Sequence, residues 1–177
     1  EVGAGIGAVA QTLAGPWIRG WTALEPDPRL ASILAKTVVD PSGRVSPRIV
    51  IGTIDAIPAE AQFDAVLYFD VLEHIDDDRG ELLAASLRVR PGGHLVVLAP
   101  AFPFVYSPFD RAVGHCRRYT KATLAAAMPS GFERRLLVYA DSIGLLLSAV
   151  NRALLRQDRP KRSQVVFWDR VIVPLSR

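Results

Sequence analysis

The sequence has little of several features that would place it in a specialised class of protein. Among its 177 residues there is one cysteine, Cys116, which excludes a disulfide framework within the chain and fits a reducing compartment, so we expect a cytoplasmic protein. No apolar run reaches the roughly 18 residues that a membrane-spanning helix needs, and the longest candidate covers only residues 143–150. Internal repeats and low-complexity stretches are also missing. A hydrophobic content of 50% over this length predicts one globular domain with a sizeable core.

The net charge of +3 conceals an asymmetry between the two parts of the chain. Residues 1–133 carry 12 Lys and Arg against 15 Asp and Glu, whereas residues 134–177 carry 9 against 3. A basic segment can face nucleic acid, anionic lipid or an acidic substrate. Its neighbours here are aliphatic rather than aromatic, which favours peripheral contact with a membrane, or a lipid-linked substrate, over RNA. A solvated helix face is the simpler alternative.

The first seven residues, Glu-Val-Gly-Ala-Gly-Ile-Gly, form a glycine-rich turn of the kind that binds nucleotides. Glycines at alternate positions suit a strand-to-helix turn whose backbone lies against a ligand, because glycine adopts positive φ and permits close approach. Glu25 follows about one βα unit later, where an acidic residue suits the two hydroxyls of a ribose. The loop alone predicts a nucleoside-containing cofactor without identifying it.

A turn of this kind normally follows a buried strand, of which only Glu1 and Val2 stand in the sequence. We therefore expect the chain to be part of a longer protein.

Downstream, apolar strand patterns alternate with helical ones. The pattern predicts helices over residues 7–14, 28–37, 78–89 and 141–156, strands over 22–25, 48–51, 63–69 and 94–99, a tight turn over 90–93, and a further possible strand over 132–139. This alternation is typical of an α/β fold with a doubly wound, mostly parallel, Rossmann-like sheet. In such a sheet ligands bind beyond the carboxyl ends of the strands. Five segments meet this condition here, namely residues 1–7, Glu25, Asp55, 70–74 and 99–103.

In order and spacing, the blocks at residues 1–7, 25, 52–55, 63–66, 71–75 and 87–95 resemble the class I S-adenosylmethionine-dependent methyltransferases of types 11 and 12. Together they cover residues 1 to about 100. A later stretch over residues 106–120 resembles, more loosely, methyltransferases of small molecules and of the cell envelope. The resemblance implies a single domain over residues 1–177, with a cofactor-binding core over 1–100 and an acceptor-side lid with C-terminal helices over 101–177. Against the family pattern, the first strand and the last strand of the sheet are missing, so we expect the fold to be incomplete at both ends.

The resemblance also implies a cofactor site for S-adenosylmethionine. The glycine loop would pass along the methionine part of the cofactor, Glu1 would lie near its ammonium group, Glu25 would accept hydrogen bonds from the ribose, and Asp55 with Ala56 would hold the adenine edge. Ile57 or Pro26 would pack on the adenine ring. The predicted cofactor-binding residues are Glu1, Gly3, Ala4, Gly5, Gly7, Glu25, Pro26, Asp55, Ala56, Ile57 and Asp70.

Methyl transfer from a sulfonium needs an aligned acceptor and exclusion of water, with a base only when the acceptor is a hydroxyl or a protonated amine. The predicted catalytic residues are Asp70, His74 and His115. The spacing of Asp70, Glu73 and His74 is also compatible with one face of a helical turn that ligates a divalent metal ion. It resembles the metal sites of ubiquinone-pathway O-methyltransferases and small-RNA 2′-O-methyltransferases. Relatives with the same Val-Leu-Glu-His-Ile sequence use these residues structurally, and this is the alternative that we favour.

After the fifth expected strand the chain carries side chains suited to an acceptor. The predicted substrate-binding residues are Tyr106, Asp110, Arg117, Arg118 and Tyr119, the arginines serving an anionic group of the acceptor. A solvated loop with an Asp–Arg pair is the alternative. The adjacent His115 and Cys116 suggest a metal site or a thiol nucleophile only weakly, because no second cysteine is present.

The sequence thus predicts an S-adenosylmethionine-dependent methyltransferase that methylates an oxygen atom of a small-molecule acceptor or of a lipid-linked or glycan-linked one. One rival is a nicotinamide-dependent oxidoreductase, for which a hydride-site motif is lacking. A second rival is a non-catalytic domain that binds the cofactor and regulates. A nucleic-acid methyltransferase is disfavoured because the motif that stacks a flipped base is absent.

Overall fold

The computed structural model describes residues 1–13, 15–37 and 47–140. Within these residues it contains four strands, five α-helices and three short 3₁₀ turns. In chain order they are α1 (Ala8–Leu13), β1 (Thr22–Glu25), α2 (Pro28–Thr37), β2 (Arg48–Ile51), η1 (Ile54–Ala56), β3 (Phe63–Phe69), η2 (Leu72–His74), α3 (Asp78–Ser86), β4 (Val89–Leu98), η3 (Pro103–Val105), α4 (Pro108–Val113) and α5 (Lys121–Ala127). No helix of the described residues is long and apolar enough to cross a membrane.

The chain divides into two compact units. The first comprises Glu1–Leu72 and Asp77–Leu98, and the second comprises Glu73–Asp76 with the residues from Ala99 onward. All four strands belong to the first unit, which we call the sheet unit. The second, which we call the loop unit, holds η3, α4 and α5.

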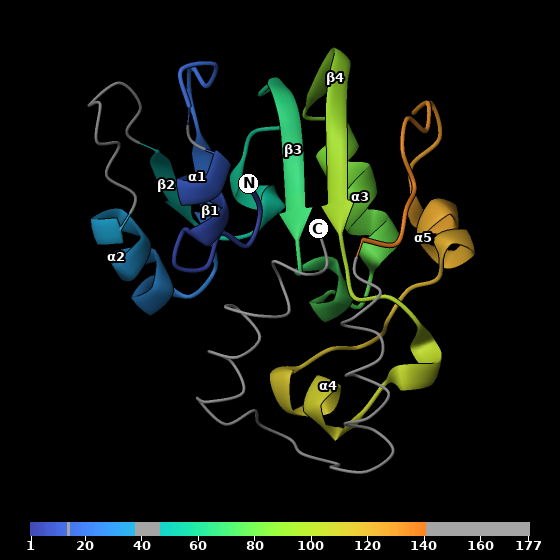
Figure 1. Ribbon diagram of the computed structural model, residues 1–177. Helices are drawn as coiled ribbons and strands as arrows, with labels where there is room; N and C mark the ends of the chain where they lie inside the picture. Colours follow the sequence, from blue (N-terminus) through green and yellow to red (C-terminus); the bar gives the residue numbers. More distant parts are fainter. Residues whose placement is uncertain (14, 38–46, 141–177) are drawn as a thin grey trace. The chain divides into compact units, whose positions relative to one another are not determined.

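The strands of the sheet unit form two parallel pairs (Figure 1), β1 with β2 and β3 with β4. Val2 joins the pairs, because it makes parallel bridges to Leu24 in β1 and to Tyr68 in β3. Its N–H donates to the Leu67 carbonyl at 2.9 Å. The Glu1–Val2 segment therefore lies between β1 and β3, in the place of a central strand. Because every pairing is parallel, the four strands and this segment run in the same direction.

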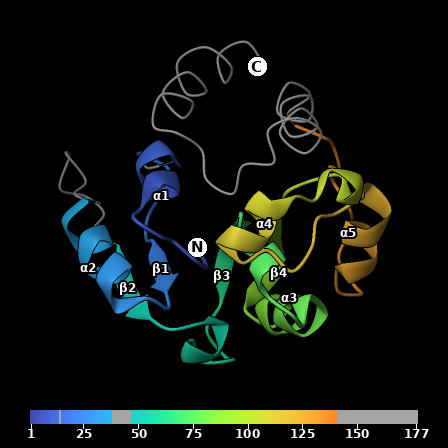
Figure 2. The same ribbon diagram turned by 90° about the horizontal axis from the view of Figure 1, so that it is seen from below.

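The helices pack by their small and aliphatic faces. Ala31 and Leu34 of α2 are buried, and α2 contacts β1 and β2, beside which it lies in both views (Figures 1 and 2). At the other end of the sheet, α3 contacts β4 and begins at Asp77, whose side chain accepts from the Gly80 N–H at 3.0 Å. This N-cap satisfies one of the free donors at the start of the helix.

In the loop unit the described residues contain one strand-like contact, a parallel bridge between Ala101 and Tyr119. The Tyr119 N–H donates to the Pro100 carbonyl and the Phe102 N–H donates to the Tyr119 carbonyl, both at 2.8 Å. Val105, Tyr119 and Ala127 are buried. Two backbone hydrogen bonds therefore hold residues 100–102 to Tyr119, and the side-chain contacts described below hold the residues between them.

The predicted α/β class with a parallel sheet is confirmed, and the strands over 22–25, 48–51 and 63–69 have the predicted bounds. The turn predicted over 90–93 lies inside β4 as an irregularity, since Phe63 pairs with Val89 but Ala65 pairs with His94. The strand suggested over 132–139 is wrong, because these residues form no ladder with any described strand. The helix predicted over 141–156, and most of the basic segment, lie outside the described residues.

Candidate active site

The glycine-rich turn has the backbone conformation that its sequence predicts. Gly3, Gly5 and Gly7 have φ of 66°, 56° and 90°, a region that other residues enter only with strain. The reason for glycine differs between positions. A Cβ on Gly3 would lie 2.5 Å from a methyl carbon of Val71, whereas a Cβ on Gly5 would meet no atom within 4 Å. Gly3 is needed for packing, and Gly5 leaves open space beside the backbone, as a ligand-binding turn requires.

Glu25 connects this turn to the end of β1. Its carboxylate is 5% exposed and accepts from the Gly5 N–H at 2.8 Å and from the Asp27 N–H at 2.9 Å. Each carboxylate oxygen has a second lone pair that can accept a hydrogen bond from a hydroxyl group. Glu25 is thus fixed by the glycine turn and keeps the acceptor capacity that a ribose would need.

The other residues predicted to bind the cofactor lie at or beside strand ends of the same unit. Glu1 accepts from the Trp21 indole N–H at 3.1 Å, and burial raises the pKa of its carboxyl. Pro26, Asp55 and Ala56 are exposed, Ala4 is buried, and Ile57 is 2% exposed. Ile57 therefore contributes to the core, and of the two residues predicted to pack on an adenine ring Pro26 is the exposed one.

Asp70, the residue that follows β3, has an unusual conformation. It is exposed and has φ of 52°, a positive value that Asp tolerates better than most residues. The following turn is a 3₁₀ turn over Leu72–His74. The prediction that Asp70, Glu73 and His74 share one face of a helical turn is wrong in this form, because the left-handed residue interrupts any helix that would include all three. Strained positions of this kind often occur at functional sites.

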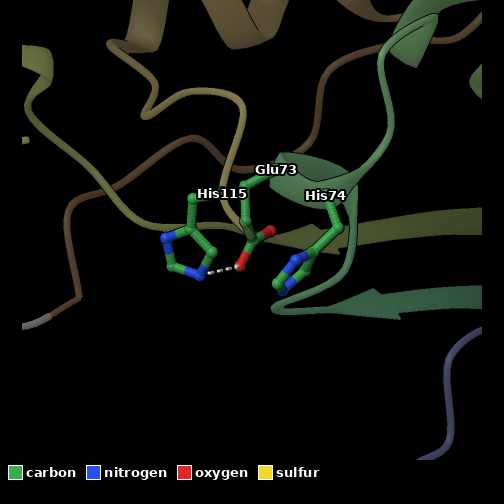
Figure 3. A group of neighbouring side chains, drawn as sticks. All are labelled: Glu73, His74 and His115. Carbon is green, nitrogen blue, oxygen red and sulfur yellow. Dashed lines mark ion pairs between the residues drawn. The ribbon is translucent and has the colours of Figure 1, made fainter. Parts of the chain in front are cut away.

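In the loop unit, Glu73 and His74 meet His115 (Figure 3). Ligand atoms of the three side chains lie within 4.8 Å of one another, and the Glu73 carboxylate lies between the two imidazoles. Glu73 is fully buried, His115 is half-buried and His74 is exposed. The two rings are in edge-to-face contact with centroids 4.8 Å apart. We call this group the Glu-His-His cluster.

Backbone contacts bring the two segments of the cluster together. The Cys116 N–H donates to the Glu73 carbonyl at 2.7 Å, and Nδ1 of His74 lies 3.2 Å from the Gly114 carbonyl oxygen. The guanidinium of Arg117 donates to the Asp76 carbonyl at 2.8 Å. Since a carbonyl only accepts, His74 carries its proton on Nδ1 in the neutral ring, and Nε2 holds the lone pair.

His115 is held from its other side by Asp110, which is fully buried. Asp110 Oδ1 lies 2.9 Å from His115 Nδ1 and 2.7 Å from Arg118 Nε, while Oδ2 accepts from the N–H and hydroxyl of Ser107 and from Arg118 Nη2. Burial alone would raise the pKa of Asp110, but the hydrogen bonds from Arg118 and His115 outweigh it and hold the pKa below its usual range. Asp110 is therefore a carboxylate that accepts from several donors at once.

Several of the residues predicted to bind the acceptor are bonded within the protein instead. Asp110 and Arg118 pair with each other in the interior, and Tyr119 is 4% exposed. Tyr106 donates from its hydroxyl to the His115 carbonyl at 2.7 Å. Which of these side chains contacts an acceptor stays a prediction.

Comparison with known proteins decides the family. Residues 1–97, more than half of the chain, match the family described as "Methyltransferase domain". The chain belongs to this family. The predicted membership of the class I methyltransferases is confirmed.

Relatives of this methyltransferase domain include the ubiquinone biosynthesis O-methyltransferase of Methylocella silvestris, 39% identical over 94 residues, which are 52% of this chain and 36% of that protein. The chain therefore spans well under two thirds of that relative. Among solved structures, a putative methyltransferase of Bacillus halodurans has a TM-score of 0.62 at 18% identity, covering 71% of this chain and 58% of the other. The YcgJ protein of Bacillus subtilis has a TM-score of 0.61 at 16% identity, with 71% and 56% covered. Both likenesses confirm the fold.

In the Glu-His-His cluster of this methyltransferase domain, a buried carboxylate faces an imidazole nitrogen. His115 Nε2 lies 3.7 Å from Glu73 Oε1. With Nδ1–H donated to Asp110, a neutral His115 turns its Nε2 lone pair to the side of Glu73. The Glu73 carboxylate would stabilise a proton that Nε2 accepts in a reaction, or a cation that both groups ligate. The cluster can therefore accept a proton or hold a divalent cation.

The helix N-terminus at Ser107 in the methyltransferase domain was not predicted. Ser107, followed by Pro108 and Asp110, has the spacing of a helix N-terminus, which would have identified Asp110 as a residue that bonds back to its own turn. The weak suggestion of a thiol nucleophile gains no support, because a hydrogen bond to Asp76 raises the pKa of the exposed Cys116 thiol. A thiol with a raised pKa is less nucleophilic at neutral pH.

Proposed function

We propose that this methyltransferase domain transfers the methyl group of S-adenosylmethionine to a hydroxyl oxygen of a small-molecule acceptor, which includes lipid-linked small molecules. The family supports methyl transfer. The observation that supports oxygen as the accepting atom is the pairing of His115 with Glu73 and Asp110, since a hydroxyl, unlike a thioether or a neutral amine, requires removal of its proton.

The sheet unit would hold the cofactor. Open space beside the Gly5 backbone and the fixed acceptor oxygens of Glu25 fit the amino-acid end and the ribose of S-adenosylmethionine. When bound, this cofactor supplies an activated methyl group. The protein then has to position the acceptor and exclude water.

The loop unit would supply the base. His115 Nε2 would take the proton of the acceptor hydroxyl, so that the hydroxyl oxygen can receive the methyl group that S-adenosylmethionine would supply, with S-adenosylhomocysteine as the other product. Glu73 stabilises the resulting imidazolium, and Asp110 accepts from its other nitrogen. The name of the Methylocella silvestris relative, an O-methyltransferase, supports this choice of atom.

Cofactor binding is tested first by calorimetric titration of the chain with S-adenosylhomocysteine, with NADH as the control ligand. We expect micromolar binding of the first and none of the second. A folded protein that binds NADH instead would support the oxidoreductase alternative, and binding of neither would contradict both.

Acceptor chemistry is tested with radiolabelled S-adenosylmethionine and paired acceptors that differ only in a phenolic hydroxyl or an aromatic amine. We expect transfer to the hydroxyl, and a loss of about 10²–10⁴-fold in kcat for His115→Gln, as for removal of a general base. His94→Gln is the matched control, because His94 is an exposed histidine on β4. Cofactor binding without any turnover would indicate the non-catalytic, regulatory alternative.

A divalent cation at the Glu-His-His cluster is the second candidate for activating the hydroxyl. One carboxylate oxygen and two imidazole nitrogens suit such an ion, which would lower the pKa of an acceptor hydroxyl. In this case dialysis against EDTA should abolish activity, Mg²⁺, Mn²⁺ or Zn²⁺ should restore it, and His74→Gln should reproduce the loss. Full activity in EDTA would leave His115 as the base.

A further inference from the structure

The side chain that most constrains His115 is Asp110, whose part in the proposed transfer is to accept a hydrogen bond from the imidazole. It is fully buried, and its two oxygens together accept from five donor atoms on Ser107, His115 and Arg118. An ionised carboxylate has no proton to donate. The contact of 2.9 Å with His115 therefore requires a proton on Nδ1 of the imidazole.

The Nδ1–H tautomer is the less common one for a free neutral histidine, whose proton prefers Nε2. Here Asp110 reverses that preference, and the backbone contributes as well. The His115 N–H donates to the Asp110 carbonyl at 2.8 Å, so the ring and the main chain of His115 are both tied to the same residue. Nε2 then faces Glu73 Oε1 with its lone pair.

We propose that Asp110 is the positioning residue of His115: it fixes the imidazole as the Nδ1–H tautomer and so keeps Nε2, the nitrogen nearer Glu73, unprotonated and able to accept a proton. Arg118 keeps Asp110 in place by binding both of its oxygens, Oδ1 at 2.7 Å and Oδ2 at 3.2 Å. A bidentate pair of this kind fixes orientation better than a single contact does. The proposal assigns Arg118 a structural task in place of direct contact with an anionic acceptor. It rests on the proposed function for its catalytic part.

The tautomer is measured directly by NMR of the full chain labelled with ¹⁵N-histidine at pH 8. His74, His94 and His115 give three imidazole spin systems, and His115→Gln assigns the one that disappears. We expect His115 to carry its proton on Nδ1 with Nε2 unprotonated. A proton on Nε2, or rapid exchange between the tautomers, would overturn the proposal whether or not the chain transfers methyl groups.

Two variants separate positioning from stability. Asp110→Asn places an amide N–H against the donors of Ser107, Arg118 or His115, so we expect the Nδ1–H signature to be lost and kcat to fall about 100-fold or more, with KM changed less than threefold. Ser107→Ala removes one hydroxyl donor on the Oδ2 side and should leave the tautomer unchanged.

Unchanged kcat in a folded Asp110→Asn variant would contradict the positioning role, as would an altered tautomer in Ser107→Ala. If Asp110→Asn does not fold, the spectrum of the wild-type chain still shows which nitrogen of His115 carries the proton, and so still tests the proposal. If no acceptor is ever methylated, the proposed function fails while the tautomer of His115 remains measurable.

Discussion

The two units of this methyltransferase domain are stabilised in different ways. In the sheet unit, parallel ladders join β1 to β2 and β3 to β4, and Val2 bridges the two pairs. In the described part of the loop unit, the one strand-like contact is the bridge between Ala101 and Tyr119. The buried carboxylate of Asp110 accepts from five donor atoms and joins Ser107, His115 and Arg118. Strand pairing holds the first unit together, whereas in the described part of the second unit a buried charge pair adds to a few backbone hydrogen bonds.

A carboxyl group in each unit shows the same contrast. Glu81 of α3 is half-buried and accepts from the Tyr68 hydroxyl at 2.7 Å, and its pKa is raised because burial outweighs this neutral partner. The pKa of Asp110 is lowered, because a guanidinium more than compensates for burial. The comparison teaches that burial alone does not fix the charge of an acid; its nearest partner does.

The largest effect is expected where the loop unit loses its charge pair. Asp110→Ala leaves Arg118, whose side chain is 11% exposed, without its carboxylate, and should lower the free energy of unfolding by about 3–5 kcal/mol. The measurement is urea unfolding. Arg29→Ala, which breaks the exposed Asp27–Arg29 pair of the sheet unit, is the control and should change stability by no more than about 0.5 kcal/mol. Equal losses in both variants would contradict the contrast between the units.

The next effect tests the backbone of the sheet unit. Gly5→Ala should cost about 1–2 kcal/mol of stability because of its positive φ alone. Gly3→Ala should cost about 1–3 kcal/mol more, since its new methyl group would overlap Val71. The double variant Gly3→Ala/Val71→Ala should recover part of this difference, measured by urea unfolding. A Gly3→Ala cost no larger than that of Gly5→Ala would refute the packing role.

A smaller effect concerns the cofactor rather than the fold. Glu25→Ala removes the carboxylate that binds the Gly5 N–H, and should weaken S-adenosylhomocysteine binding by about 1–3 kcal/mol in calorimetric titration. Asp27→Asn is the control, because Asp27 lies in the same loop and is half-buried but is not among the residues predicted to bind the cofactor. Unchanged affinity for Glu25→Ala would remove Glu25 from the ribose site.

The smallest effect distinguishes the two acids by pH. The pKa of Asp110 is depressed, so its contribution to stability is present above about pH 4 and is lost as the pH falls through its folded pKa. Glu81 has a raised pKa, so its ionisation opposes folding as the pH rises above about 4.5. Tyr68→Phe, which removes the hydroxyl that donates to Glu81, should lower the free energy of unfolding by about 1 kcal/mol. In unfolding curves from pH 3 to 7, Glu81→Gln should remove the decrease in stability at higher pH. The decrease in stability at low pH, which comes from Asp110, should remain. Identical profiles for Glu81→Gln and the wild type would contradict this assignment.

The sequence by itself determined the sheet unit in some detail. Short apolar runs predicted the bounds of β1, β2 and β3, and the glycine turn was recognisable because positive φ at Gly3, Gly5 and Gly7 demands that residue. These are local properties, since period and turn chemistry depend on residues close together in the chain. The position of Glu25 followed from the same local rule, because it stands at a strand end.

Only the tertiary structure decided how the loop unit uses its polar residues. His115 and Glu73 come together because the chain returns past the 3₁₀ turn, and Asp110 points inward because Arg118 and Ser107 satisfy its charge. No periodic pattern encodes such pairings. An Asp in a polar loop looks the same in the sequence whether it is solvated or buried, and its partners are fixed only when loop closure brings the donors to it.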